Sequence, residues 1–398
     1  MKNEKIILYL ISFMWFCAIV DFLLMLPLGT AFMDLYKITP HAYSYLIGAF
    51  SIGGFLSSFF ASFYVDKFDR KTVYLSAFAL FGVGTFMCSF AYTYEFMLFA
   101  RFFTGLFGGL LGGVSTAIIS DIIPYERRGK AMAVLNLSFG VASIVGIPFS
   151  IFIYKYSDIF WPFRLVGIIS FVAFIHAFYF LPSLTGHINK DTRTFHEVKE
   201  ILKNRNLQKA LLFAFLLVLG HFMFISFINP YLIDNLNFKD EDTMWMYIVG
   251  GLSVTLTTTR MGKFIDTLGK VKSFRILILL SFIPILAISH IQEASIMLAL
   301  FICAFMFIFN SGRMVAAMTL ITGAPTEEQR GKFLLIRSSF IELSEGTASI
   351  IGGMILTQNP ITMELMNYNI VAYIAVFIGI ICIYLAQKIE INEDAVEE

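Results

Sequence analysis

Asp121-Ile-Ile-Pro-Tyr-Glu-Arg-Arg-Gly-Lys130 and Pro325-Thr-Glu-Glu-Gln-Arg-Gly-Lys332 are two copies of one motif, and their repetition decides the fold. The shared Arg-Gly-Lys steps lie 202 residues apart, and each opens an apolar run. A second landmark repeats at nearly the same offset, because Asp66 returns 200 residues later as Asp266. Two landmarks at one offset indicate a duplicated unit.

The apolar runs are long enough to cross a membrane, which requires about 20 residues each. Each half of the chain holds six of these runs, and an all-α membrane protein of twelve transmembrane helices in two six-helix bundles is therefore expected. The twelve predicted spans are residues 6–33, 41–65, 72–92, 94–122, 131–154, 161–181, 208–234, 242–262, 272–290, 294–322, 332–357 and 365–386.

The composition excludes a water-soluble protein. Of 398 residues, 58% are hydrophobic and only 14% are charged, whereas soluble proteins carry about 25% charged residues. The net charge of +1 gives no electrostatic case for nucleic acid. The four cysteines all lie inside apolar runs without metal-ligand spacing, so we expect buried thiols and no metal site.

Basic residues favour one orientation. If both termini are cytoplasmic, the inner segments hold 22 of the 29 lysines and arginines and the outer loops hold three. This bias predicts a multi-pass protein of a bacterial-type inner membrane with both ends in the cytoplasm. The expected units are residues 1–181 and 208–386 as bundles, 182–207 as a cytoplasmic linker and 387–398 as an acidic tail.

Three motifs resemble those of the major facilitator superfamily. Ser62-Phe63-Tyr64-Val65-Asp66-Lys67-Phe68-Asp69-Arg70-Lys71 is similar to its loop signature Gly-x-x-x-Asp-Arg-x-Gly-Arg-Lys, with Ser62 and Asp69 replacing the glycines. The fourth span carries Arg101-x-x-x-Gly105-x-x-x-Gly109, and the fifth carries Gly140 through Gly146-Ile147-Pro148. The last two resemble motifs of the drug:proton antiporter branch, including its arabinose-efflux-permease-like members.

Ionisable residues inside hydrocarbon are costly, by at least ~2.5–3.5 kcal/mol on insertion scales, and are therefore candidates for function. Asp21 lies near the middle of the first span, before Pro27. An unpaired carboxylate there should bind and release a proton according to which side admits water. The alternative is a structural carboxyl satisfied by a neighbouring backbone group or an arginine. The resemblance implies a role for Arg101 in proton coupling.

The eleventh span carries Glu342 and Glu345 on one face, three residues apart. Two carboxylates this close in a poor solvent need a proton or a cation. Arg313 of the tenth span lies at a similar depth, so we expect an ion pair between Arg313 and Glu345 or Glu342. Glu345 is the rival to Asp21 as proton carrier.

Other candidates fall into two sets. The substrate cavity is expected to be lined by Asp21, His221, Asn229, Asn310, Arg313, Glu342 and Glu345. The resemblance implies a charge relay that holds the bundles together at the cytoplasmic side and acts in gating; its candidate residues are Asp66, Arg70, Asp121 and Asp266.

These features predict proton-coupled antiport that expels a small organic molecule, with the proton gradient as energy source and no cofactor. A monomer with protons, substrate and membrane lipid as its partners is expected. The alternative is a proton symporter or facilitator that imports a metabolite or siderophore. A receptor without transport is the weaker option, and an enzyme is not expected, because no nucleophile–base spacing, phosphate loop or metal cluster occurs.

Overall fold

The computed structural model describes residues 2–185, 188, 194–293 and 295–392. Within this part, side chains are not described for Lys2, Asn3, Asp66, Tyr125, Glu126, Thr194, Phe195, His196, Glu327 and Glu328.

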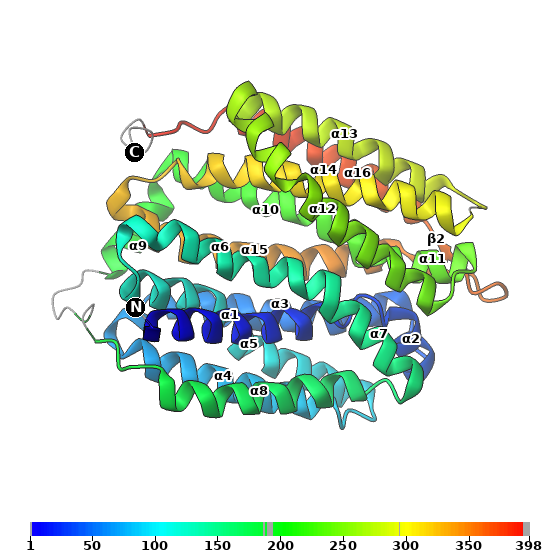
Figure 1. The fold of residues 1–398 in the computed structure, drawn as a ribbon. Helices are drawn as coiled ribbons and strands as arrows, with labels where there is room; N and C mark the ends of the chain where they lie inside the picture. The colour runs from blue at the N-terminus through cyan, green and yellow to red at the C-terminus, as the bar shows by residue number, and fades with distance from the viewer. Residues whose placement is uncertain (1, 186–187, 189–193, 294, 393–398) are drawn as a thin grey trace.

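The described chain is almost entirely helical (Figure 1). The first half contains α1 (Lys2–Leu23), α2 (Gly29–Tyr36), α3 (Pro40–Ala61), η1 (Val65–Lys67), α4 (Arg70–Cys88), α5 (Tyr94–Ile122), α6 (Tyr125–Val141), η2 (Ala142–Gly146), α7 (Ile147–Tyr156) and α8 (Trp161–Phe180). The second half contains α9 (Thr194–Lys203), α10 (Arg205–Ile225), α11 (Ile228–Leu236), α12 (Asp240–Leu268), α13 (Lys270–His290), α14 (Ile296–Thr322), α15 (Glu327–Ile355), β1 (Thr357–Gln358), β2 (Leu365–Met366) and α16 (Tyr368–Ala386). The two short strands pair antiparallel, with Thr357 opposite Met366.

The duplication extends to the helix starts. α3 and α12 begin 200 residues apart, as do α4 and α13; α5 and α14 begin 202 residues apart, as do α6 and α15. Their caps repeat as well, since the hydroxyls of Thr93 and Ser295 accept from the third backbone amide of α5 and α14. Lys37 and Asn237, 200 residues apart, both end a short helix in the left-handed conformation.

The predicted fold class is confirmed. Ten helical segments of the described chain are long and apolar enough to span a membrane. α12 and α15 are more polar, but each has 29 residues and is therefore about 43 Å long, enough to cross the hydrocarbon. Both belong to the second bundle, so that within the described residues each bundle has six spanning helices. The start of α1, the linker helix α9 and the end of α16 lie at one end of the molecule, called here the terminal end (Figure 1).

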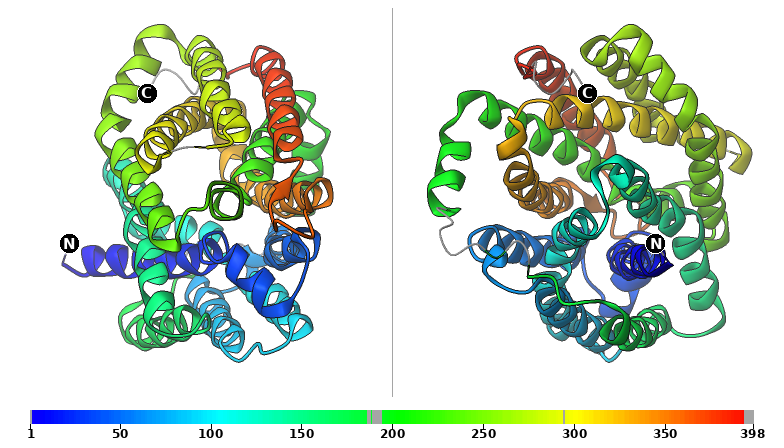
Figure 2. Two further views of the ribbon diagram at one scale, coloured as in Figure 1. Left: turned by 90° about the vertical axis from the view of Figure 1, so that its right-hand side faces the viewer. Right: turned by 60° about the vertical axis from the view of Figure 1, so that its left-hand side comes forward.

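The two bundles meet along two seams of different length. On one side α15 packs along α3 (Figure 2), and small residues allow this approach: Gly346 lies against Gly48, and Gly353 against Ser44. On the other side α12 packs against η2 and α7. The fifth membrane-spanning helix consists of α6, η2 and α7, and η2 and α7 form its half away from the terminal end. The bundles are thus held together at the end opposite the termini.

An ion pair and a hydrogen bond reinforce that closed end. Lys155 of α7 lies 2.6 Å from Glu241 of α12. The side-chain amide of Asn229 donates to the carbonyl of Pro27 at 3.2 Å. Both contacts cross between the bundles.

Cysteine labelling checks the predicted orientation. The four native thiols are buried, so an introduced cysteine reports alone. Thr185→Cys lies near the terminal end, and Ile361→Cys lies in the hairpin at the opposite end, where Ile361 is 89% exposed. An impermeant maleimide should label Ile361→Cys in intact cells and Thr185→Cys only after the membrane is opened. The reverse pattern would place the termini outside.

The packing of α3 on α5 provides a stability test. A Cβ at Gly105 would fall 2.7 Å from the Cα of Phe50, a backbone atom that cannot yield alone. Gly105→Ala should therefore destabilise the bundle by about 1–3 kcal/mol, measured as a lower thermal unfolding midpoint in detergent. Gly140→Ala is the matched control, because a Cβ added at Gly140 would meet no heavy atom within 4 Å. Equal effects of the two substitutions would contradict the packing argument.

Candidate functional site

The first and the seventh membrane-spanning helices are interrupted at corresponding places. α1 ends at Leu23 and α2 begins at Gly29, while α10 ends at Ile225 and α11 begins at Ile228. Pro27 and Pro230 lie in or just after these breaks, where each removes a backbone donor. Interrupted helices at matching positions of two repeats point to the central site of a transporter.

Asp21 and Arg101 form an ion pair beside the first break. Nη1 of Arg101 lies 2.8 Å from Oδ2 of Asp21, and both side chains are 0% exposed. The same nitrogen donates to the Asp21 carbonyl at 3.3 Å, and the guanidinium lies 4.6 Å from the centre of the Phe50 ring. The structure thus shows the alternative arrangement, an arginine partner for Asp21, because α5 turns Arg101 inward toward α1.

This pair is incompletely hydrogen-bonded. Within the described residues, Oδ1 of Asp21 and both Nε and Nη2 of Arg101 are buried without a partner. Each buried polar atom left unpaired costs about 1–3 kcal/mol. When the bundle rearranges, Oδ1 of Asp21 can therefore bind a proton or accept a hydrogen bond from a ligand, and Nε and Nη2 of Arg101 can donate to one.

Arg313 does not contact Glu342 or Glu345, the two acids of α15. Its Nη1 donates to the Ser281 hydroxyl at 3.0 Å, and the side chain is only 4% exposed. The expected ion pair with Glu345 or Glu342 is absent from the described part of the chain, so that prediction was wrong. Arg313 points from α14 toward α13 inside its own bundle, whereas the acids lie on α15.

His221 lies at the position equivalent to Asp21, 200 residues later. It is half-buried on α10. Asn229 and Asn310 are almost fully buried, and the side-chain oxygen of each lacks a hydrogen-bond partner among the residues described. The structure thus leaves acceptor atoms of both asparagines available in the second bundle.

Glu342 lies where the two bundles meet, and not inside the second bundle, to which its helix α15 belongs. It occupies the middle of α15, and the Ser58 hydroxyl of α3 donates to its Oε1 at 3.5 Å. Gly54 of α3 and Gly109 of α5 flank the carboxyl. Glu345 follows one turn later and is half-buried. Sequence reasoning missed this glycine notch, although Gly109 belongs to the motif quoted above.

Of the gating candidates, Arg70 and Asp121 come together. They form an ion pair across α4 and α5, and Arg70 also donates to the carbonyl of Ala117 at 3.1 Å. The side chain of Asp66 lies outside the described residues. Asp266 is exposed and forms no ion pair within the described chain.

Asp69, which replaces a motif glycine, connects the linker to α4. Its carboxylate accepts from the Leu184 amide and the Ser183 hydroxyl, each at 2.8 Å, and from the Lys71 amide at 3.0 Å. Burial acts to raise the pKa of Asp69, but these hydrogen bonds outweigh it and hold the pKa below its usual value. Asp69 therefore stabilises this junction above its ordinary pKa, and the contribution disappears as the pH falls through the lowered value.

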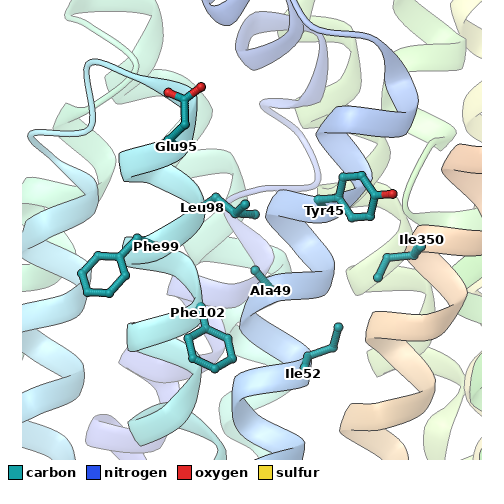
Figure 3. A pocket seen from close by; sticks show the side chains of 8 residues that line it. All are labelled: Tyr45, Ala49, Ile52, Glu95, Leu98, Phe99, Phe102 and Ile350. Atoms are coloured by element: carbon teal, nitrogen blue, oxygen red, sulfur yellow. The ribbon is translucent and has the colours of Figure 1, made fainter.

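A separate groove of about 430 Å³ opens between α3, α5 and α15 (Figure 3). Its lining is apolar except for the hydroxyl of Tyr45 and the carboxylate of Glu95, which lies at the start of α5. None of the candidate site residues lines it.

The chain is similar to several curated transporters. It is 25% identical over 321 residues to the MFS-type transporter YwfA of Bacillus subtilis, covering 80% of this chain and 74% of that protein. It is 20% identical to multidrug resistance protein 2 of the same organism, over 90% of each chain. A probable sugar efflux transporter of Helicobacter acinonychis is 24% identical over half of each chain.

Solved structures share the fold. A bacterial homologue of the human lysosomal transporter Spinster, in an inward-facing and occupied conformation, superposes with a TM-score of 0.75 at 12% identity over 98% of this chain and 97% of that one. The nucleoside transporter NupG superposes with a TM-score of 0.73 at 15% identity over 97% and 99% of the two chains. The sequence model of the Major Facilitator Superfamily matches residues 10–312 and 210–389. The duplicated bundles, the interrupted helices and these matches lead to one conclusion: the chain is a multi-pass membrane transporter and belongs to the Major Facilitator Superfamily.

Proposed function

We propose that this transporter is a proton-coupled antiporter that exports a small organic molecule. The observation that carries the proposal is the fully buried Asp21–Arg101 pair next to the break in helix one. Relatives named as multidrug resistance and efflux proteins support the direction of transport. The protein functions as a monomer in a bacterial inner membrane with its termini in the cytoplasm, and the proton gradient supplies the energy without a cofactor.

Protonation of Asp21 is the proposed coupling step. A proton on Asp21 removes the negative charge that Arg101 faces, and breaking a buried pair of this kind costs about 3–5 kcal/mol when the remaining charge stays buried. Arg101 must then find another partner, and the five-residue interruption after α1 permits local rearrangement there. Proton binding thereby changes the relative stability of the two transport conformations.

The closed end of the structure is the outer end in this proposal. Lys155–Glu241 and Asn229–Pro27 close it, and the substrate would enter from the terminal end. His221, Asn229, Asn310 and Glu345 remain the proposed polar residues of the cavity.

The coupling step can be tested with Asp21→Asn, which mimics the protonated state. Transport driven by a pH gradient should fall at least about tenfold, whereas substrate counterflow, which moves no net protons, should remain. Unfolding measured in detergent should show a loss of about 3–5 kcal/mol, because Arg101 is left without its counter-charge. The double variant Asp21→Asn/Arg101→Gln should recover part of that stability.

Glu345→Gln is the comparison variant, because Glu345 is the rival proton carrier and lies on another helix. If Glu345→Gln abolishes uphill transport and Asp21→Asn keeps an unchanged pH dependence, the coupling role lies on α15. Substrate and protons moving in the same direction in proteoliposomes would instead indicate a symporter.

The gating role of Arg70 and Asp121 can be tested by exchanging their charges. Arg70→Asp and Asp121→Arg should each slow transport, and the double variant should recover about fivefold, because a partly exposed pair contributes roughly 1 kcal/mol. The measurement is initial uptake at matched protein amounts with binding assayed in parallel. A double variant no better than the single ones would show that their mutual attraction is not what matters.

A further inference from the structure

The carboxyl of Glu342 crosses the seam between the bundles and enters a notch in the first bundle. A Cβ at Gly54 would lie 2.8 Å from Cδ of Glu342, and a Cβ at Gly109 would lie 2.6 Å from Oε2. Any larger residue at either position would displace the carboxyl. The two glycines therefore make the space that this acid fills.

The notch provides little to stabilise a negative charge. Oε1 has one long hydrogen bond from Ser58, at 3.5 Å. Oε2 is buried and has no hydrogen-bond partner among the described residues. No lysine, arginine or histidine nitrogen of that part of the chain lies within 4 Å of the carboxyl.

The described residues on the helices around Glu342 place no positive charge next to its carboxyl. On α15 the nearest ionisable residues are Glu345, one turn ahead, and Arg337, more than one turn behind. α3 and α5 contribute Ser58, Gly54 and Gly109 at this level. On α10 the facing carbonyl of Phe215 is already bound by Ser344 of α15, and His221 lies almost two turns farther from the terminal end.

Glu342 is half-buried, with Oε2 fully buried. A carboxylate in this position, without a cation and with one weak hydrogen bond, is unfavourable, and such a group takes up a proton instead. The neutral acid needs no counter-charge, so placing it in the notch costs less than placing the carboxylate there. The carboxyl of Glu342 is therefore more stable in the notch when it is protonated than when it is ionised.

A small hollow lies next to the notch, toward the terminal end; Ser58 and Gly109 line it, and Glu342 itself does not. Its volume is about 20 Å³, enough for one water molecule. Ser58, Ser62 and Ser338 contribute its hydroxyls, and Gly109 and Val65 also line it. Ser58 is shared with Glu342, and Val65 precedes Asp66, so the hollow lies between the acid and the polar end of α3.

We propose that Glu342 is a proton-exchange site that holds the bundles together along the α3–α15 seam. The proton leaves the carboxyl on the side of Oε1, passes Ser58 to water in the hollow and reaches solvent at the terminal end. The carboxylate that remains is poorly solvated in the notch, so α15 loosens from α3 and α5. Reprotonation returns the neutral acid to the notch. This inference rests on the proposed proton coupling and adds a second proton site to Asp21.

Infrared spectroscopy of the purified transporter without substrate tests the protonation directly. A pH titration should show a protonated-carboxyl stretch that is absent from Glu342→Gln and present in the matched control Glu345→Gln. Ser58→Ala, which removes the only hydrogen-bond donor that the described residues offer to the carboxyl, should shift the pH midpoint of that band upward by up to about one unit. A band that persists unchanged in Glu342→Gln overturns the proposal.

Spin labels test the link to the seam. Lys67 and Gly331 are exposed, in η1 shortly after α3 and at the start of α15. Spin labels are attached to Lys67→Cys and Gly331→Cys, and the native thiols are buried. Their separation should increase with pH in the otherwise wild-type protein and stay constant in Glu342→Gln. A pH-dependent separation that survives in Glu342→Gln, or none in the wild type, overturns the role in the seam.

The outcomes separate this inference from the proposed function. If the carboxyl band and the seam respond to pH as described but transport moves no protons, the antiport proposal fails and the proton-exchange site stands. If protons are coupled to transport while the band belongs to another acid, the site fails and antiport stands. Where Glu342→Gln does not fold, Ser58→Ala decides the question through the shifted midpoint, and an unshifted midpoint overturns the proposal.

Discussion

Close approach of α3, α5 and α15 is the contact on which the rest of this transporter depends. Helices surrounded by lipid gain little from hiding apolar surface, so they associate through tight packing and polar contacts. Gly105 lets the backbone of α5 touch that of α3, and Gly48 and Gly353 let α15 lie along the same helix. α3 therefore belongs to the core of the first bundle and to the seam with the second, and movement of one bundle against the other has to slide or open this contact.

The structure places two acids inside the membrane in opposite surroundings. Asp21 has Arg101 as its counter-charge, inside one bundle. Glu342 has glycines and one serine, between bundles. The repeat makes this difference informative, because the positions 200 and 202 residues after Asp21 and Arg101 are His221 and Cys303. The two halves share the helix starts and the breaks but not the charges of Asp21 and Arg101, so the second bundle has no counterpart of this ion pair at those positions.

Much of the fold could be predicted from the sequence because its causes are local. Apolar length marks the spans, and the motifs at Arg128 and Arg330 reveal the duplication. Side-chain partners were harder, as Asp21 and Arg313 show. Whether Arg313 meets Ser281 or Glu345 depends on the rotation of α14 about its axis relative to three neighbouring helices, and residue spacing along one helix does not determine that rotation. Arg70 and Asp121 were easier, since both lie at helix ends where few partners compete.

The free part of the linker is much shorter than the whole segment 182–207, because contacts hold both of its ends to the bundles. Asp69 holds Ser183 and Leu184 against the first bundle, while α9 packs on α10 and α15, and its Glu197 pairs with Lys332. Only residues 185–193 join these two anchored points, and ten Cα-to-Cα steps span at most about 35 Å when fully extended. This length sets an upper limit on how far the two attachment points can separate at the terminal end. Any motion that carries the two attachment points farther apart than this limit has to release the contacts of Asp69 with Ser183 and Leu184, or those of α9 with α10 and α15.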